Sequence, residues 1–222
     1  MALAHHMPTS RVARARQMHV VLGGALLVVG VFSLTVGATD VALGPTLLKL
    51  AQGEALTRME AIVLWDIRAP RLVLGLFVGA ALAVGGAVMQ GLFRNPLADP
   101  GLVGVSAGAG RGAITAIVLS GVAPLWLAAT VGDQLVPVAA FLGGWASTMV
   151  LYQVSTRRGR TSVATMLLAG IALGALAGAL SGILVYISDD RQLRDLTFWG
   201  LGSLGGASWT KVIGAGPIIL IA

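Results

Sequence analysis

The sequence predicts an all-α protein whose helices cross a membrane several times. Three observations predict this fold class: 56% of the 222 residues are hydrophobic, only 11% are charged, and the apolar residues form long uninterrupted runs. A soluble domain would carry about 25% charged residues. Glycine contributes 31 residues whereas aromatic residues make up 5%, which is typical of helices that pack closely in lipid.

Six apolar segments are candidates for membrane-crossing helices, because crossing a bilayer takes about 20 mostly apolar residues. They are residues 19–39, 71–91, 102–121, 135–153, 162–187 and 210–222. The last run is still apolar where the sequence stops, so we expect an N-terminal portion of a longer protein. We divide it into a basic cytoplasmic tail, residues 1–18, and a transmembrane domain, residues 19–222, that is incomplete at its C-terminus.

The first apolar segment also resembles a secretory signal peptide, because Arg11, Arg14 and Arg16 precede it. The run from Val20 to Ala38 exceeds the usual apolar core of about 7–15 residues, and further apolar segments follow it. These two features favour an uncleaved helix.

Basic residues predict that the N-terminus is cytoplasmic, since short cytoplasmic loops are enriched in Lys and Arg. The N-terminal tail carries three arginines and no acid, and the loop after the fourth segment carries Arg157, Arg158 and Arg160, also without an acid. Segments 40–70, 122–134 and 188–209 then face outward, and they hold eight of the nine acidic residues. We therefore expect a multi-pass membrane protein with a cytoplasmic N-terminus.

Several function classes are disfavoured by composition. The net charge of +6 reflects 15 basic against 9 acidic residues, and no stretch interleaves basic with aromatic residues, so nucleic-acid binding is not indicated. Gly104-Val-Ser-Ala-Gly108 matches a hydrolase pattern, but all three histidines lie at or before His19, which leaves Ser106 without a base. We expect no enzymatic activity, no cofactor and no metal site, and we interpret Ser106 as a packing or pore residue.

Three of the segments carry small residues at every fourth position, a spacing that lets neighbouring helices approach closely. The stripes are Gly75/Gly79/Ala83/Ala87, Gly104/Gly108/Gly112/Ala116 and Gly170/Gly174/Gly178/Gly182. Packing alone would explain them, and so would grooves that border a translocation path.

Two clusters of polar residues flank the second segment. Arg68 and Arg71 are predicted at its outer mouth, near one face and able to bind carboxylates, with Pro70 where the helix starts. Contact with lipid headgroups is the alternative for both arginines. At the inner end, Asn95-Pro96 predicts a rigid break in the helix.

The motifs Arg68-Ala-Pro-Arg71 and Arg94-Asn-Pro-Leu-Ala-Asp-Pro100, followed by Gly104-Val-Ser-Ala-Gly108, resemble the permease family of ABC importers for iron-siderophores, haem and vitamin B12. Leu167–Gly174 and Arg194–Ser203 are similar to family segments in the same order. The resemblance runs from about residue 20 and implies a type II ABC importer permease fold, a polytopic helical bundle with about six of roughly ten helices present.

The resemblance also implies partners. They are a second copy of the chain, two cytoplasmic ATP-binding subunits and a periplasmic substrate-binding protein, with the bilayer around the permease. Arg68 and Arg71 match arginines that receive acidic residues of the binding protein. The permease itself would be non-catalytic, since the partner subunits hydrolyse ATP.

By the same resemblance, Asn95 and Leu97 match positions that narrow the cytoplasmic end of the pathway. Ser162, Val163 and Ala164 match a second inner constriction. A plain loop turn remains the alternative for both segments. Val163 and Ala164 stand where some relatives carry hydroxyl groups, so the chemistry of this gate stays open.

Arg111 lies within an apolar segment, where an arginine costs about 3 kcal/mol on insertion scales. No acidic residue lies at comparable depth. One hypothesis is that Arg111 meets an anionic substrate, such as the haem propionates or a siderophore carboxylate. The other is that it binds backbone carbonyls at a helix or subunit contact.

The sequence thus predicts a permease subunit of an ATP-driven importer for an iron chelate, with haem as the specific substrate and Ser106 and Arg111 on the path. Vitamin B12 or siderophore import are alternatives. An ATP-independent secondary carrier is a further alternative, although the lack of acids at membrane depth disfavours proton coupling. A membrane subunit without a pathway is the structural alternative.

Overall fold

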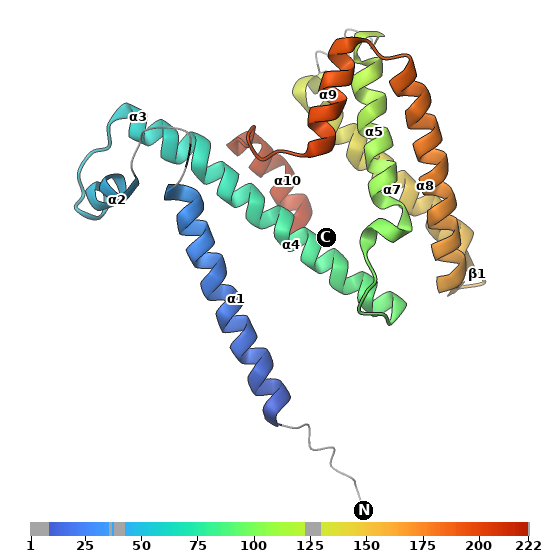
Figure 1. The fold of residues 1–222 in the computed structure, drawn as a ribbon, viewed down its shortest axis with the longest axis horizontal. Coiled ribbons are helices and arrows are strands. Elements are labelled where there is room, and N and C mark those ends of the chain that lie inside the picture. Colours follow the sequence, from blue (N-terminus) through green and yellow to red (C-terminus); the bar gives the residue numbers. More distant parts are fainter. Residues whose placement is uncertain (1–8, 36, 38–42, 123–129, 222) are drawn as a thin grey trace, which may run out of the picture. The chain divides into compact units, whose positions relative to one another are not determined.

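The structure is a computed structural model that describes residues 9–35, 37, 43–122 and 130–221. The described chain is almost entirely helical (Figure 1). It forms two compact units, one made of Met1–Gly79 with Leu204–Ala222 and the other of Ala80–Ser203. The predicted all-α fold class is confirmed.

The first unit contains α1, α2, α3, the start of α4, and α10. Their bounds are Thr9–Thr35, Leu43–Ala51, Arg58–Ala61, Ala69–Phe93 and Trp209–Ile221. Helix α1 begins ahead of the predicted segment 19–39, because the Ala, Arg and Gln residues of the basic N-terminal stretch have high helix propensity. The indole Nε1 of Trp209 donates a hydrogen bond to the Trp65 carbonyl (2.7 Å), which ties α10 to the helical turn Ile62–Arg68 that precedes α4.

Pro70 does not mark the start of a helix, so this part of the prediction was wrong. Helix runs without a break from Arg58 to Phe93, and a π-helical turn, Ile62–Arg68, directly precedes α4. In a regular α-helix the Pro70 ring would clash with the carbonyl four residues earlier. The π turn, in which the Ala69 N–H bonds to the Leu64 carbonyl, widens the backbone at this point and accommodates the proline.

The second unit contains the rest of α4 and helices α5, α7, α8 and α9. The last four span Val105–Leu119, Leu135–Ser155, Val163–Tyr186 and Asp190–Leu201. Short 3-10 turns, Pro100–Val103, Ser120–Val122 and Gly132–Gln134, lie between the helices. An antiparallel hairpin of β1, Thr156–Arg157, and β2, Arg160–Thr161, joins α7 to α8.

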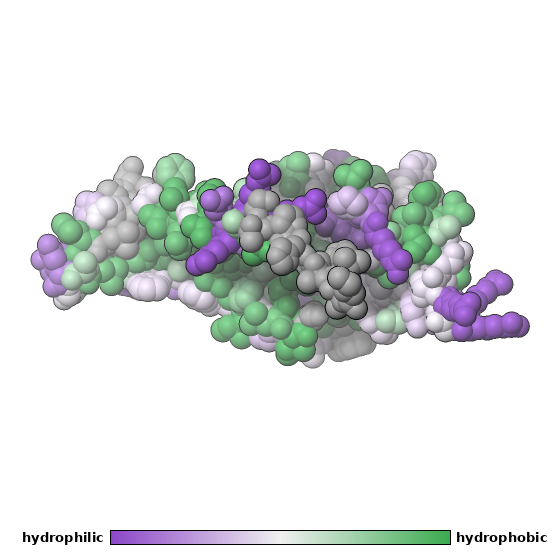
Figure 2. All heavy atoms as spheres, turned by 90° about the horizontal axis from the view of Figure 1, so that it is seen from below, coloured by the Kyte–Doolittle hydropathy of each residue, from purple (hydrophilic) through white to green (hydrophobic). Residues whose placement is uncertain are grey.

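Each of the six predicted apolar segments contains a helix. Four helices of the described chain are long and apolar enough to cross a membrane: Arg11–Thr35, Arg58–Phe93, Leu135–Ser155 and Val163–Tyr186. Val105–Leu119 and Trp209–Ile221 are shorter. Hydrophobic side chains cover much of the face shown in Figure 2, and hydrophilic ones gather in patches. This surface suits a chain surrounded by lipid, and we conclude that the protein is a multi-pass membrane protein.

Helices α5 and α7 pack backbone against backbone, as the second glycine stripe predicts. A Cβ on Gly108 would lie 2.6 Å from the Gly143 carbonyl oxygen, and one on Gly112 would collide with the Ala139 carbonyl. The Ser147 hydroxyl of α7 donates to the Gly104 carbonyl at the start of α5 (3.1 Å). The stripe on α5 is therefore a packing surface. By contrast, a Cβ on Gly178 of α8 would meet no described atom within 4 Å.

A small hydrophobic cluster joins three elements at one end of the second unit. Its buried members are Val103, Leu151 and Met166, and side chains of α4, including Met89 and Phe93, pack against them. The C-terminal end of α4 and the N-terminal end of α8 therefore lie at the same end of this unit.

The glycine contacts give a stability prediction. We expect Gly112→Ala to destabilise the protein by about 1–3 kcal/mol, because the added methyl group must displace the backbone of α7. Gly178→Ala is the matched control, since its methyl group would occupy open space and alanine favours helix over glycine. Thermal unfolding of both variants in detergent measures the difference. Equal melting temperatures would contradict the close approach of α5 and α7.

Candidate functional site

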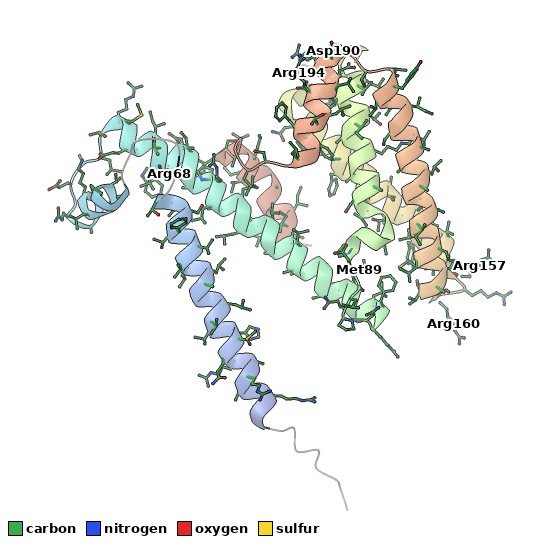
Figure 3. The ribbon with its side chains drawn as sticks, in the orientation of Figure 1. Arg68, Met89, Arg157, Arg160, Asp190 and Arg194 are labelled. Atoms are coloured by element: carbon green, nitrogen blue, oxygen red, sulfur yellow. The ribbon has the colours of Figure 1, made fainter. Side chains whose placement is uncertain are left out.

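Arg68 closes the C-terminal end of α1. Its side chain is buried, with 5% of its surface exposed, and its Nη1 donates to the carbonyls of Leu34 (2.6 Å) and Thr35 (3.3 Å). The last carbonyls of a helix lack hydrogen-bond donors within the helix. The Arg68 guanidinium supplies donors to these carbonyls at the end of α1. Arg68 is therefore buried within the first unit and not exposed at its surface (Figure 3).

Arg71 has an unsatisfied donor. It lies one turn after Arg68, on α4, and its side chain is half-buried. Its Nε is buried, and the Nε–H donates to no acceptor among the residues that the structure describes. Leaving a buried charged donor unpaired is unfavourable by about 1–3 kcal/mol. The remainder of the guanidinium of this half-buried side chain also has no hydrogen bond or ion pair within the described part of the chain.

The break after α4 is built from local hydrogen bonds. Arg94 adopts a left-handed conformation (φ 48°), and the N–H groups of Arg94 and Asn95 bond back to the carbonyls of Gly91 (3.3 Å) and Gln90 (3.2 Å). This is a Schellman ending, in which glycine usually occupies the position of Arg94. The Asn95 Oδ1 then accepts the Leu97 N–H (3.0 Å). Asn95 thus fixes the turn, and Leu97 is left 83% exposed.

The segment Ser162–Ala164 starts α8. The Ser162 Oγ accepts the Thr165 N–H (3.3 Å) and therefore caps the helix. Val163 and Ala164 are exposed. Because the cluster of Val103, Leu151 and Met166 joins the end of α4 to the start of α8, both segments predicted to form the inner gate lie at one end of the same unit.

Arg111 lies on the wall of a cavity of about 700 Å³ between α5, α7 and α8. Most of its lining is apolar, and the polar side chains on the wall are Arg111, Thr115, Ser120 and Ser147. No hydrogen bond or ion pair of the Arg111 guanidinium is found within the described part of the chain. Ser106 is exposed on α5 but does not line this cavity. The two residues proposed for the path are therefore not brought together.

Sequence reasoning missed the polar group that fixes α5 to α7. Ser147 lines the cavity and bonds to α5, yet nothing in its sequence surroundings marks it beyond the small residues nearby. Among the described residues, no group of three His, Cys, Asp or Glu side chains could hold a metal ion.

These features define a polytopic helical membrane protein with a glycine-packed helix pair and a mostly apolar cavity whose wall carries Arg111. The model of the FecCD transport family matches residues 25–222. The chain belongs to this family.

Permease proteins of two transport systems are similar to this chain in sequence. The haemin transport system permease protein HmuU of Yersinia pestis is 47% identical over 155 residues, which cover 70% of this chain and 45% of the relative. The cobalamin import system permease protein BtuC of Halobacterium salinarum is 42% identical over 160 residues, covering 72% of this chain and 41% of the relative. The chain thus spans somewhat less than half the length of these relatives.

A solved structure is also similar. A metal-chelate type ABC transporter in an inward-facing conformation matches with a TM-score of 0.69 and 26% identity, over 93% of this chain and 58% of that one. The permease family inferred from the arginine and Asn-Pro motifs is confirmed.

Arg94 gives a prediction on the turn after α4. A left-handed conformation costs a residue with a side chain about 1–2 kcal/mol, so Arg94→Gly should stabilise the protein by about 1 kcal/mol. Arg94→Ala is the control, because alanine removes the same charge and keeps the strain. Unfolding in detergent compares the two variants, and a glycine variant no more stable than the alanine variant would contradict the left-handed ending.

Proposed function

We propose that this chain is the membrane permease of an ATP-driven importer that moves an iron chelate, with haem as the specific cargo, across the bacterial inner membrane into the cytoplasm. Membership of the FecCD transport family over residues 25–222 is the observation that carries this proposal. The haemin permease of Yersinia pestis supports haem as the cargo, at 47% identity.

The permease would carry out no covalent chemistry. It would work as a pair of identical subunits, with two ATP-binding subunits inside and a substrate-binding protein outside. ATP binding would change the relative stability of inward-facing and outward-facing arrangements, and the cargo would cross between them. A largely apolar lining rich in Gly and Ala offers a large chelate little affinity, which favours release.

Arg111 supports an anionic cargo. A single cationic side chain on a mostly apolar wall suits a molecule with an apolar body and few negative charges. Haem has this character, since two propionates extend from a planar apolar ring. An arginine fork can bind such a carboxylate through two parallel hydrogen bonds.

The inner gate would be formed by Asn95 and Leu97 together with Ser162, Val163 and Ala164. Their location at one end of the second unit supports this assignment. The exposed Leu97 and Val163 would supply apolar contacts, and the hydrogen bonds of Asn95 and Ser162 would hold the backbone that presents them.

Docking of the binding protein would use Arg71 together with Arg68. The Arg71 side chain is only half-buried, and its guanidinium has no hydrogen bond or ion pair among the described residues, which favours it as the group that receives a carboxylate. Arg68 is bonded to α1, so its contribution would combine positive charge with the positioning of the helix that carries Arg71.

Docking can be measured with the purified binding protein. Arg71→Gln should weaken its affinity by about tenfold or more, because a charged hydrogen bond is lost and an acceptor on the partner stays unpaired. Arg58→Gln is the control, as Arg58 is an exposed arginine of the same unit. Equal affinities of the Arg71 variant and the wild-type protein would exclude Arg71 as the docking residue.

Transport by the complete importer in proteoliposomes tests the cargo. We expect haem uptake that requires ATP, and Arg111→Gln should reduce its rate by about tenfold or more through loss of a charged contact, while Ser106→Ala should transport normally. Uptake without ATP would contradict the proposal that the chain belongs to an ATP-driven importer. Normal ATP-driven uptake by the Arg111 variant would contradict only the role of this arginine.

A further inference from the structure

Helices α7 and α8 are joined by a tight hairpin that carries three arginines. We call residues 156–161 the arginine hairpin. Thr156 pairs with Thr161 and Arg157 with Arg160 in an antiparallel register. The two threonine hydroxyls are 2.9 Å apart, and the Ser162 N–H bonds to the Ser155 carbonyl (3.0 Å). The connection is therefore an ordered element with a defined register.

The arginines of this hairpin do not favour its local fold. Arg157 stands directly opposite Arg160, and like charges in this arrangement are destabilising. Arg158 has φ 51° and Gly159 has φ 72°, as in the turn type that prefers Asn-Gly. An arginine at the first of these positions is strained. The reason for three arginines must therefore lie outside the hairpin.

Nothing in the described chain neutralises these charges. All three side chains are exposed, and no ion pair or hydrogen bond of their guanidinium groups is found among the residues in the described ranges. The sequence contains no acidic residue from Gln134 to Ser188. The hairpin therefore presents three positive charges to whatever lies beside it.

The flanking helices place the hairpin at a membrane surface. Helices α7 and α8 have 21 and 24 residues and are both apolar enough to cross a bilayer, and the hairpin lies between their adjoining ends. Figure 3 shows Arg157 and Arg160 extending from this end, while Asp190 and Arg194 lie at the opposite end of the unit. Whichever way the chain is oriented, the hairpin lies at the depth of the lipid headgroups.

We propose that the arginine hairpin binds the phosphates of anionic lipids. Guanidinium groups bind phosphate through two parallel hydrogen bonds, and each basic residue beside an anionic membrane surface strengthens binding about fivefold. The position of the hairpin at the end of two membrane-crossing helices favours a lipid over an acidic protein, because the lipid-facing side of these helices borders headgroups at this depth. The lipid compensates both the charge repulsion and the strain at Arg158.

The test uses the full chain in detergent with equal parts of phosphatidylglycerol and phosphatidylcholine, and mass spectrometry counts the lipids retained after purification. The test variant is R157Q/R158N/R160Q, in which asparagine suits the left-handed position. The matched control is R58Q/R191Q/R194Q, which removes the same charge from exposed arginines elsewhere. Arg158→Asn alone keeps the test possible if the triple variant does not fold.

We expect the wild-type protein and the control to retain phosphatidylglycerol preferentially, and the hairpin variant to lose about tenfold or more of this preference. Arg158→Asn should lose about fivefold. An unchanged preference in the hairpin variants, or an equal loss in the control, would overturn the proposal. A second measurement follows hydrogen exchange of the Ser162 amide in phosphatidylcholine without anionic lipid. Protection when inorganic phosphate is added would show a free-anion site, and protection only when the ATP-binding subunit is added would show a protein contact. Either result would also overturn the lipid proposal.

Discussion

The close approach of α5 and α7 at Gly108, Gly112 and Gly143 is the contact on which the rest of the second unit depends. Lipid tails are as apolar as leucine, so helices in a bilayer gain little from burying apolar side chains against each other. They associate through van der Waals contact, and glycine lets the backbones themselves meet. On this frame α5 carries Arg111 toward the space shared with α7 and α8. The two segments proposed for the inner gate lie at the end of α4 and at the start of α8.

Several buried or partly buried polar groups form hydrogen bonds from one helix to another. Ser147 bonds to the Gly104 carbonyl, Gln192 to the Val118 carbonyl (3.0 Å), and Arg68 to the end of α1. Each acceptor lies near a helix end or beside a glycine, where backbone oxygen is accessible. Gln192 also completes the capping box with Asp189 that starts α9. These bonds fix the position of each helix along its neighbour within a unit. Nonpolar packing alone is less directional and would fix this position less closely.

Much of the fold follows from the sequence because apolar length and small-residue spacing are local signals. The six apolar segments contain helices, and the Asn95-Pro96 break lies where the motif indicates. The helix start predicted at Pro70 was wrong because a π turn accommodates this proline inside a continuous helix. The bonds of Arg68 join residues 34 positions apart, and no local pattern predicts such a partner. The turn at Arg158-Gly159 was not predicted, because arginine is uncommon at a left-handed turn position and only two residues pair on each side. The docking and gate residues rest on resemblance and stay predictions.

The proposed importer requires that α8 cross the membrane, with its two polar ends on opposite faces. The arginines proposed for docking and the residues proposed for the inner gate would otherwise not face separate compartments. The chain has no cysteine, so single cysteines at Arg158 and Arg191 can be labelled without background. A membrane-impermeant maleimide should label Arg158→Cys only in inverted vesicles and Arg191→Cys only in right-side-out vesicles. Labelling of both positions from the same side would contradict the membrane-crossing arrangement and the importer built on it.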